Sequence, residues 1–262
     1  MLAMDYTGMT PAQMRAKFRS GELSIPTAGI CPGYIQGNLV ILGNEYASDF
    51  LQFMKQNPQP CPILEVFDQG TPISHKMAEG ADITTDIPLY RVYRYGELVD
   101  ELTDISKFWN ADMTGFLIGC SLTFEARLIK AGIPLKHCEE NKRVPMFNSN
   151  IECKPSRLFH GNFVVSMRPV KKDLVQKAVD ITAPLTYAHG APVHIGDPSA
   201  IGINDVFNPD YGDPLDIAPD EVPVFWACGV TPQNVAMQTK PDFMLTHSPG
   251  YMFISDINID NL

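Results

Sequence analysis

The sequence predicts an α/β protein, with a layered main domain built on a mostly parallel or mixed sheet and a smaller inserted α+β lobe. Apolar runs of strand length alternate with amphipathic segments of helical length along the chain. The run MTGFLIG at 113–119 is almost wholly apolar, which is typical of a strand buried on both faces of a parallel sheet. Two strand-like segments, a helix and a further strand follow each other between 136 and 198, and this order predicts a ββαβ lobe. We therefore assign residues 1–135 and 199–262 to the main domain and residues 136–198 to the inserted subdomain.

Composition excludes several classes of function. The chain has 262 residues, 45% of them hydrophobic, which suffices for a substantial core. Its formal net charge of −10 and its lack of a basic run argue against a nucleic-acid partner. No apolar run approaches the roughly 20 residues of a membrane helix, and the first ten residues lack the pattern of a signal peptide. The six cysteines form no CxxC pair, so we expect free thiols in a reducing, cytoplasmic setting.

The first helix is predicted from its start signals. Thr10 is a suitable N-cap, Pro11 suits the first helical position, and Gln13 completes a capping box. Gly21 should end this helix after Ser20.

The other elements follow from apolar spacing and from glycine and proline breaks. An aromatic and methionine stripe predicts a helix at 45–56, and LTFEARLIK predicts one that Gly132 closes. No internal repeat is evident. The remaining predicted elements are strands at 63–67, 113–119, 144–148, 162–170, 191–196, 221–227, 243–246 and 252–254, a turn that leads into an alternating strand within 82–95, and helices at 171–181 and 231–240.

The stretch from residue 187 to residue 251 is the first half of a predicted active site. Three of the six histidines lie in it, His189, His194 and His247. Glycines, prolines and reactive side chains are denser here than packing requires, and loops of this type often carry binding and catalytic groups.

Cys120 and Ser121 form the second half. They lie between the predicted strand at 113–119 and the helix that follows. Ligands bind outside the carboxyl ends of parallel strands, and a helix N-terminus favours a carboxylate or a thiolate. Glu125 lies one helical turn beyond Ser121, on the same face, and we expect it to point inward. The chain contains neither a GxGxxG loop nor a GxxxxGK[ST] loop, so nucleotide-dependent chemistry is not supported. We expect the reaction to need no cofactor.

Several of these segments together resemble the D-glutamate cyclase family, whose bacterial members are named as hydro-lyases. The resemblance covers about residues 10–255 and depends on the segments TAGICPGYIQGNLVIL, NPQPCPILEV, GADITTDIPLYRVYRYGEL, FLIGCSLTFE, NFVVSMRP, HGAPVHIGDPSAIGI, EVPVFWACGVTPQ and THSPGYM. It implies a carbon–oxygen lyase that dehydrates D-glutamate to 5-oxo-D-proline, without a cofactor, on a two-part α/β architecture. The partner would be a small amino acid or carboxylate; a homo-oligomer is left open.

The chemistry of cyclisation suggests roles for individual residues. A guanidinium group should hold the α-carboxylate of the substrate, and Arg168 is the candidate. A structural salt bridge would explain the presence of Arg168 equally well. A base, an acid and donors for the oxyanion are also needed. The catalytic candidates are His189, His194, Asp197, Cys120 and Glu125. The substrate-binding candidates are Arg168, Ser121, Thr231, Gln233 and His247.

Three alternatives remain at this point. In the first, His189, His194 and Asp197 bind a divalent metal for hydrolysis or dehydration, provided that the chain turns between the two histidines. In the second, the protein only binds a small carboxylate, without catalysis. In the third, Cys120 is a nucleophile with histidine and aspartate partners. Asp197 could also simply cap the turn that follows it.

Overall fold

The computed structural model describes residues 6, 8–68 and 70–261. Part of the N-terminal stretch on which the signal-peptide expectation depends therefore lies outside the described residues. The helices are α1 (Pro11–Arg19), α2 (Asn44–Gln56), α3 (Leu122–Lys130), α4 (Lys136–Glu139), α5 (Val175–Thr182) and α6 (Val230–Thr239). The strands are β1 (Tyr34–Gly43), β2 (Ile63–Phe67), β3 (Tyr90–Arg94), β4 (Glu97–Leu102), β5 (Met113–Gly119), β6 (Met146–Glu152), β7 (Asn162–Lys171), β8 (His194–Ile195), β9 (Glu221–Ala227), β10 (Met244–His247) and β11 (Phe253–Asn258).

The larger sheet has the strand order β2-β5-β1-β10-β3-β4, and β11 also pairs with β1. Every paired neighbour in it is antiparallel. The α/β class is confirmed, but the prediction of a mostly parallel or mixed sheet is wrong. The apolar run of β5 reflects burial on both faces, and burial on both faces does not require parallel strands. Phe116 packs with α2 on one face, and Leu117 packs on the other.

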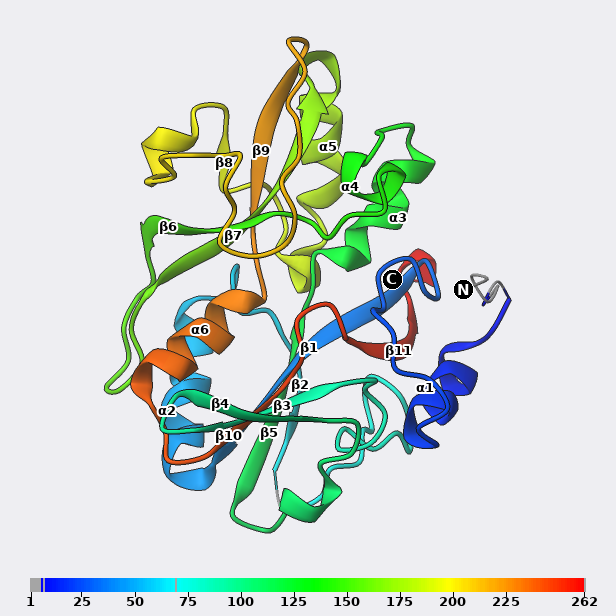
Figure 1. Ribbon diagram of the computed structural model, residues 1–262, viewed down its shortest axis with the longest axis vertical. Helices are drawn as coiled ribbons and strands as arrows, with labels where there is room; N and C mark the ends of the chain where they lie inside the picture. The colour runs from blue at the N-terminus through cyan, green and yellow to red at the C-terminus, as the bar shows by residue number, and fades with distance from the viewer. Residues whose placement is uncertain (1–5, 7, 69, 262) are drawn as a thin grey trace.

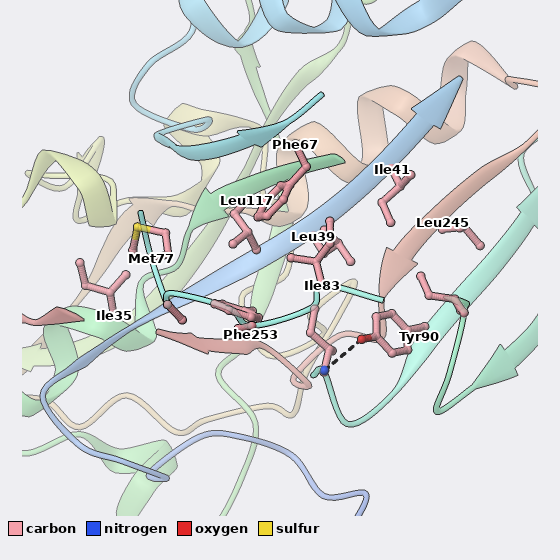
Figure 2. Close-up of a cluster of buried hydrophobic side chains, with 14 of the residues drawn as sticks. Ile35, Leu39, Ile41, Phe67, Met77, Ile83, Tyr90, Leu117, Leu245 and Phe253 are labelled. Atoms are coloured by element: carbon pink, nitrogen blue, oxygen red, sulfur yellow. Dashed lines mark hydrogen bonds between the residues drawn. The ribbon is translucent and has the colours of Figure 1, made fainter. Parts of the chain in front are cut away.

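The loop before β3 covers the second face of the larger sheet. Met77 and Ile83 from this loop pack against Leu39 and Leu117 of the sheet (Figure 2). The hydroxyl of Tyr90 in the same cluster accepts a hydrogen bond from the backbone N–H of Ile87 at 3.0 Å. A well-packed loop therefore replaces the helix layer that a parallel sheet would have had.

The smaller sheet has the order β6-β7-β9-β8 and is antiparallel throughout. It lies above the larger sheet in Figure 1, with α3, α4 and α5 beside it. The predicted order of two strands, a helix and a strand is present in β6, β7, α5 and β8. Strand β9, however, pairs with β7 and β8, so the predicted boundary at residue 198 cuts through this sheet. The division into two domains remains a proposal, in which β9 belongs to the smaller domain because it pairs with β7 and β8.

Two helices connect the sheets. Each follows a strand of one sheet and packs against the other sheet. Helix α3 follows β5 of the larger sheet, but Phe124 and Leu128 of this helix pack with Trp226 of the smaller sheet. Helix α6 follows β9 of the smaller sheet, but Val235 packs with Val40 of the larger one. Figure 1 shows the two connections passing each other at the junction of the sheets. The N-termini of α3 and α6 therefore both lie at this junction.

The local signals of the first helix are confirmed. The Thr10 side chain accepts from the backbone N–H of Gln13 at 3.3 Å, and the Gln13 side chain accepts from the backbone N–H of Thr10 at 2.9 Å. Helix α3 is closed as predicted, with Gly132 in the left-handed region at φ +79°. Within the described residues, no helix has the length and apolar character that crossing a membrane requires.

Candidate active site at the junction of the two sheets

The turn from β5 into α3 begins the site. Strand β5 ends at Gly119, Cys120 follows, and Ser121 is the N-cap residue of α3. The predicted strand–turn–helix step is confirmed, although β5 is not a parallel strand. Gly119 is needed here because a Cβ would lie 1.8 Å from the carbonyl oxygen of Tyr187. This close contact places the segment before His189 directly against the end of β5.

Arg168 of β7 is held at the same place. Its side chain is 1% exposed, and its Nη2 donates to Ser121 Oγ at 3.1 Å and to Glu125 Oε1 at 2.5 Å. Its Nη1 donates to Ser166 Oγ at 3.0 Å. The guanidinium carbon also lies 5.6 Å from the ring centre of Trp226. The guanidinium is therefore fixed in position and orientation, as a site that recognises a planar carboxylate needs.

Glu125 points inward, as the sequence predicted. Its side chain also contacts His137 of α4, with Nε2 of the histidine 3.0 Å from Oε1. Burial opposes ionisation of Glu125, but Arg168 and His137 outweigh burial and lower its pKa. Glu125 is therefore a carboxylate at neutral pH, with its charge compensated by Arg168. A carboxylate in this state is poorly suited to act as an acid and better suited to holding the guanidinium.

His189 lies beside this group in a strained conformation. Its backbone is left-handed, with φ +76°, which is uncommon for a residue other than glycine and often marks functional sites. Its Nδ1 lies 2.9 Å from the carbonyl oxygen of Gln59, so Nδ1 carries the proton and donates it. By hydrogen-bond geometry its buried Nε2 has no partner among the described residues, although the backbone of Gly119 lies near the ring and raises its pKa. Burial, together with the charge of Arg168, lowers the pKa of His189 to about 4.

The structure thus brings five of the predicted residues together and separates the other five. Cys120, whose pKa responds to the charges of Glu125 and Arg168, belongs to the group. The residues that the structure brings together are Cys120, Ser121, Glu125, Arg168 and His189. The residues whose side chains form their hydrogen bonds with other groups are His194, Asp197, Thr231, Gln233 and His247.

His194 and Asp197 lie at the outer edge of the smaller sheet. The Asp197 carboxylate accepts from the backbone N–H and the hydroxyl of Ser199, at 3.0 Å and 2.8 Å, and caps the short helical turn that follows. His194 Nε2 is 2.7 Å from the carbonyl oxygen of Asp197. His189 is buried and His194 is only partly buried, because the chain between them leads from the junction to this edge strand. Among the described residues they do not form the metal site of the first alternative.

The other separated residues stabilise the fold. The Thr231 hydroxyl accepts from the backbone N–H of Val164 at 2.9 Å, and Gln233 donates to the Thr246 hydroxyl at 2.8 Å. His247 is 1% exposed, and its Nδ1 accepts from the backbone N–H of Leu39 at 3.1 Å. Each of these contacts links neighbouring elements rather than facing the Arg168 group.

Ser166, His137 and Cys138 also lie in this group, although no pattern in the sequence had indicated them. Ser166 precedes Arg168 by two residues, so the alternation of side chains along a strand could have placed both on one face. His137 and Cys138 are adjacent in sequence, but their approach to Glu125 depends on how α4 packs. No local pattern could have indicated that contact.

Glu125, His137 and Cys138 are the only group of three or more metal-ligand residues among the residues that the structure describes. Cys138 Sγ lies 3.4 Å from His137 Nε2 and 3.9 Å from Glu125 Oε2. Nitrogen, sulfur and oxygen donors of this type suit zinc. The same carboxylate is already paired with Arg168, however, so a cation would have to compete with the guanidinium. This arrangement does not favour a metal-dependent reaction.

Comparison with known proteins identifies the family. The family model described as D-glutamate cyclase matches residues 96–256. This chain belongs to the D-glutamate cyclase family. Two relatives, each named "Putative hydro-lyase", come from Thermoanaerobacter sp. strain X514 and Bacillus licheniformis. The first is 53% identical over 99% of this chain and 98% of its own length, and the second is 54% identical over 97% of both.

A third relative of the same name, from Bacillus subtilis, is 50% identical over 97% of this chain and 99% of its own length. A solved structure, a nitrogen repressor-like protein from Methanococcus jannaschii, aligns with 90% of this chain and 91% of its own. Its sequence identity is 11% and its TM-score is 0.39, a likeness that supports no assignment. The family assignment therefore depends on the family model and on the hydro-lyase relatives, not on this structure.

Proposed function

We propose that this protein is a hydro-lyase that closes D-glutamate to 5-oxo-D-proline and releases water. The observation that carries the proposal is the buried guanidinium of Arg168, fixed by Glu125 and by two serine hydroxyls beside a helix N-terminus. Membership of the D-glutamate cyclase family and the names of the relatives support the reaction class.

Arg168 is suited to hold a carboxylate of the substrate. Two of its contacts go to the neutral hydroxyls of Ser121 and Ser166. A carboxylate accepts stronger, charge-assisted hydrogen bonds than a hydroxyl does. A substrate carboxylate could therefore replace one hydroxyl while Glu125 keeps the guanidinium in place. Because Arg168 is 1% exposed, the surrounding segments must open for the substrate to enter.

His189 is suited to accept a hydrogen bond from the substrate amine, although its pKa of about 4 makes it a weak base. Its Nδ1 hydrogen is donated to Gln59, so the lone pair on Nε2 is available. In the reaction, the α-amine attacks the γ-carboxyl carbon, the C–N bond forms, the C–O bond breaks and water leaves. The nitrogen loses a proton and the departing oxygen gains one. Holding amine and carboxyl together supplies much of the rate, since the step is intramolecular.

The proposal is tested by turnover. The purified protein is incubated with D-glutamate, with L-glutamate and with related amino acids, and products that have lost water are measured by mass spectrometry. We expect product from D-glutamate, and about 10²-fold lower kcat/KM for Arg168→Lys, because a lysine ammonium cannot reproduce the planar set of donors that contacts Glu125 and the serine hydroxyls at once.

Serine variants separate the site from general stability. Ser121→Ala should alter KM, whereas Ser24→Ala should not. The latter removes the hydroxyl of an exposed serine, which donates to the carbonyl oxygen of Pro88 at 2.8 Å, away from the site. Measurable binding of D-glutamate with no product from any amino acid would favour the alternative, a protein that binds a small carboxylate without catalysis.

A further inference from the structure

The two carboxylate oxygens of Glu125 have different partners. Oε1 accepts both hydrogen bonds from Arg168, from Nε at 3.1 Å and from Nη2 at 2.5 Å, and it lies 3.0 Å from His137 Nε2. The hydrogen-bonding contact of Oε2 among the described residues is the Cys138 thiol, 3.9 Å away. One oxygen therefore holds the guanidinium, and the other faces Cys138 of α4.

Three donor atoms of different kinds converge at this carboxylate. Cys138 Sγ lies 3.4 Å from His137 Nε2 and 3.9 Å from Glu125 Oε2, and one ligand atom of each residue lies within 4.8 Å of the others. A tetrahedral zinc ion, with bonds of about 2.0–2.3 Å to nitrogen, oxygen and sulfur, keeps its ligand atoms about 3.3–3.6 Å apart. The two distances at Cys138 therefore match a zinc site to within about 0.3 Å.

The hydrophobic core holds both helices that carry these side chains. Phe124 and Leu128 of α3 belong to the same apolar cluster as Leu135, the N-cap residue of α4. Glu125 and His137 are 6% and 3% exposed, so packing restricts both side chains. An ion that binds here would not have to order its ligands first, and such preorganisation favours binding.

Cys138 makes this group accessible from the surface. All six cysteines lie within the described residues, and Cys138 is the exposed one. It lines a surface hollow of about 490 Å³ together with Glu139 and Lys171. An ion can therefore reach the sulfur without the opening that a substrate of the buried Arg168 needs. The open side also leaves the fourth position of a tetrahedral ion to a water molecule.

The Cys138 thiol does not have to be ionised before the ion arrives. Burial and the charge of Glu125 raise the pKa of this thiol to about 11. A bound cation offsets the charge of Glu125 and displaces the thiol proton, so a S–Zn bond replaces the S–H bond and one proton passes to solvent. His137 Nδ1 is buried and has no partner in the described part of the chain, so it can carry the ring proton while Nε2 binds the ion.

We propose that Glu125, His137 and Cys138 form a zinc site that inhibits the protein. Without zinc, the charge of Glu125 compensates Arg168 and fixes its orientation. A doubly charged ion at Oε2 draws on the same negative charge and repels the guanidinium. The ion is thus a regulator and not a cofactor of the reaction. The inhibition rests on the proposed function, whereas the binding of zinc does not.

Binding is tested with cobalt(II), which adopts the tetrahedral geometry of zinc and gives a charge-transfer absorption when a thiolate binds it. The whole protein, purified without a histidine tag and treated with a chelator, is titrated with Co²⁺. We expect this absorption to saturate at one ion per chain, to disappear when Zn²⁺ is added, and to form more readily as the pH rises. Cys138→Ser should lose the absorption and bind zinc about 10²-fold more weakly, since even the outer partners of metal ligands contribute 10–100-fold.

His75→Ala is the matched control. His75 Nδ1 lies 3.2 Å from a carboxylate oxygen of Glu79, and both side chains are exposed, so this pair offers a cation two ligands away from Cys138. The variant should bind cobalt as the wild type does, and Mg²⁺, which prefers oxygen ligands, should not displace the cobalt. A wild type without the charge-transfer absorption, or a Cys138→Ser variant that keeps it, overturns the zinc site.

Inhibition is measured for each variant against its own zinc-free value, both on turnover and on the binding of D-glutamate by calorimetry. Zinc should lower the wild-type kcat/KM by about 10²-fold, because a displacement of about 1 Å at a positioning group can have that effect. At the concentration that saturates the wild type, zinc should leave Cys138→Ser within about 2-fold of its zinc-free value. An equal loss in both proteins, or no loss in the wild type, overturns the inhibition.

The zinc site and the proposed function fail separately. A cobalt–thiolate absorption that depends on Cys138, in a protein that forms no product, refutes the hydro-lyase and supports the zinc site. Product from D-glutamate without that absorption refutes the zinc site and leaves the hydro-lyase.

Discussion

Replacement of Glu125 by glutamine should destabilise the protein strongly. The substitution keeps the shape of the side chain but removes the charge that compensates Arg168, which is 1% exposed. Removing one partner of a buried ion pair costs about 3–5 kcal/mol, because the remaining charge stays buried without compensation. For a chain of this size, about 4 kcal/mol corresponds to a decrease in Tm of about 8–16 °C.

A surface pair provides the control. Arg91 and Glu101 form an ion pair at 2.8 Å, but their side chains are 30% and 43% exposed. Glu101→Gln should therefore cost less than about 1 kcal/mol. The free energy of unfolding is measured by urea titration, followed by tryptophan fluorescence, to which Trp226 beside Arg168 contributes. A Glu125→Gln variant that loses no more stability than Glu101→Gln would refute the reasoning.

A double variant separates charge from packing. Arg168→Met combined with Glu125→Met removes both charges and leaves apolar side chains of similar length. Such replacements of buried ion pairs are often neutral or stabilising. The double variant should therefore be more stable than Glu125→Gln. If it is less stable, the contacts of Arg168 with the serine hydroxyls, rather than its charge, dominate the stability of the junction.

Three further predictions concern stability. His189 and His247 both have a folded pKa of about 4, against 6.5 for an ordinary histidine, so the unfolded chain binds more protons between these values. The free energy of unfolding should therefore fall by about 3 kcal/mol for each histidine as the pH decreases from about 6.5 to about 4. A urea midpoint that stays unchanged over this range would contradict the argument that burial lowers these pKa values. A Cβ at residue 229 would lie 1.9 Å from Asn38 Nδ2, so Gly229→Ala should destabilise the wild type more than it destabilises an Asn38→Ala variant. Equal losses of stability in a double-mutant cycle would show that this clash does not matter. Thr10→Ala should lower the Tm through the loss of about 1 kcal/mol of helix capping, which thermal unfolding would detect.

The elements of this fold could be predicted because their signals are local. The capping box at Thr10, the turn into α3 and the closing Gly132 all depend on residues a few positions apart. Strand direction could not be predicted in this way. The apolar run of β5 indicates burial on both faces, and a packed loop can bury a face as well as a helix can. The pairing of β5 with β1 and β2 is a long-range property that one strand does not encode.

The candidate site could be predicted only in part, for the same reason. Arg168 and Glu125 are 43 positions apart, and His189 and Gln59 are 130 positions apart. Chemistry suggested Arg168 and His189 because their side chains suit the reaction. It suggested His194 and Asp197 equally, and only the route of the chain to an edge strand separates them from the junction. Residue type therefore selects candidates, and long-range packing decides among them.

Helices α3 and α6 connect the two sheets, so a movement that opens the site to a substrate also moves the residues proposed to act on it. Each helix is attached to one sheet through its cysteine turn and packed on the other through its apolar face. A change in the angle between the sheets must therefore be absorbed at the turns that contain Cys120 and Cys228. The same change displaces the side chain of Asn38, whose Nδ2 donates to the carbonyl oxygen of Gly119 at 2.8 Å and lies against Gly229. Admission of a substrate to the buried guanidinium and the position of Ser121 at the N-terminus of α3 consequently depend on one set of contacts.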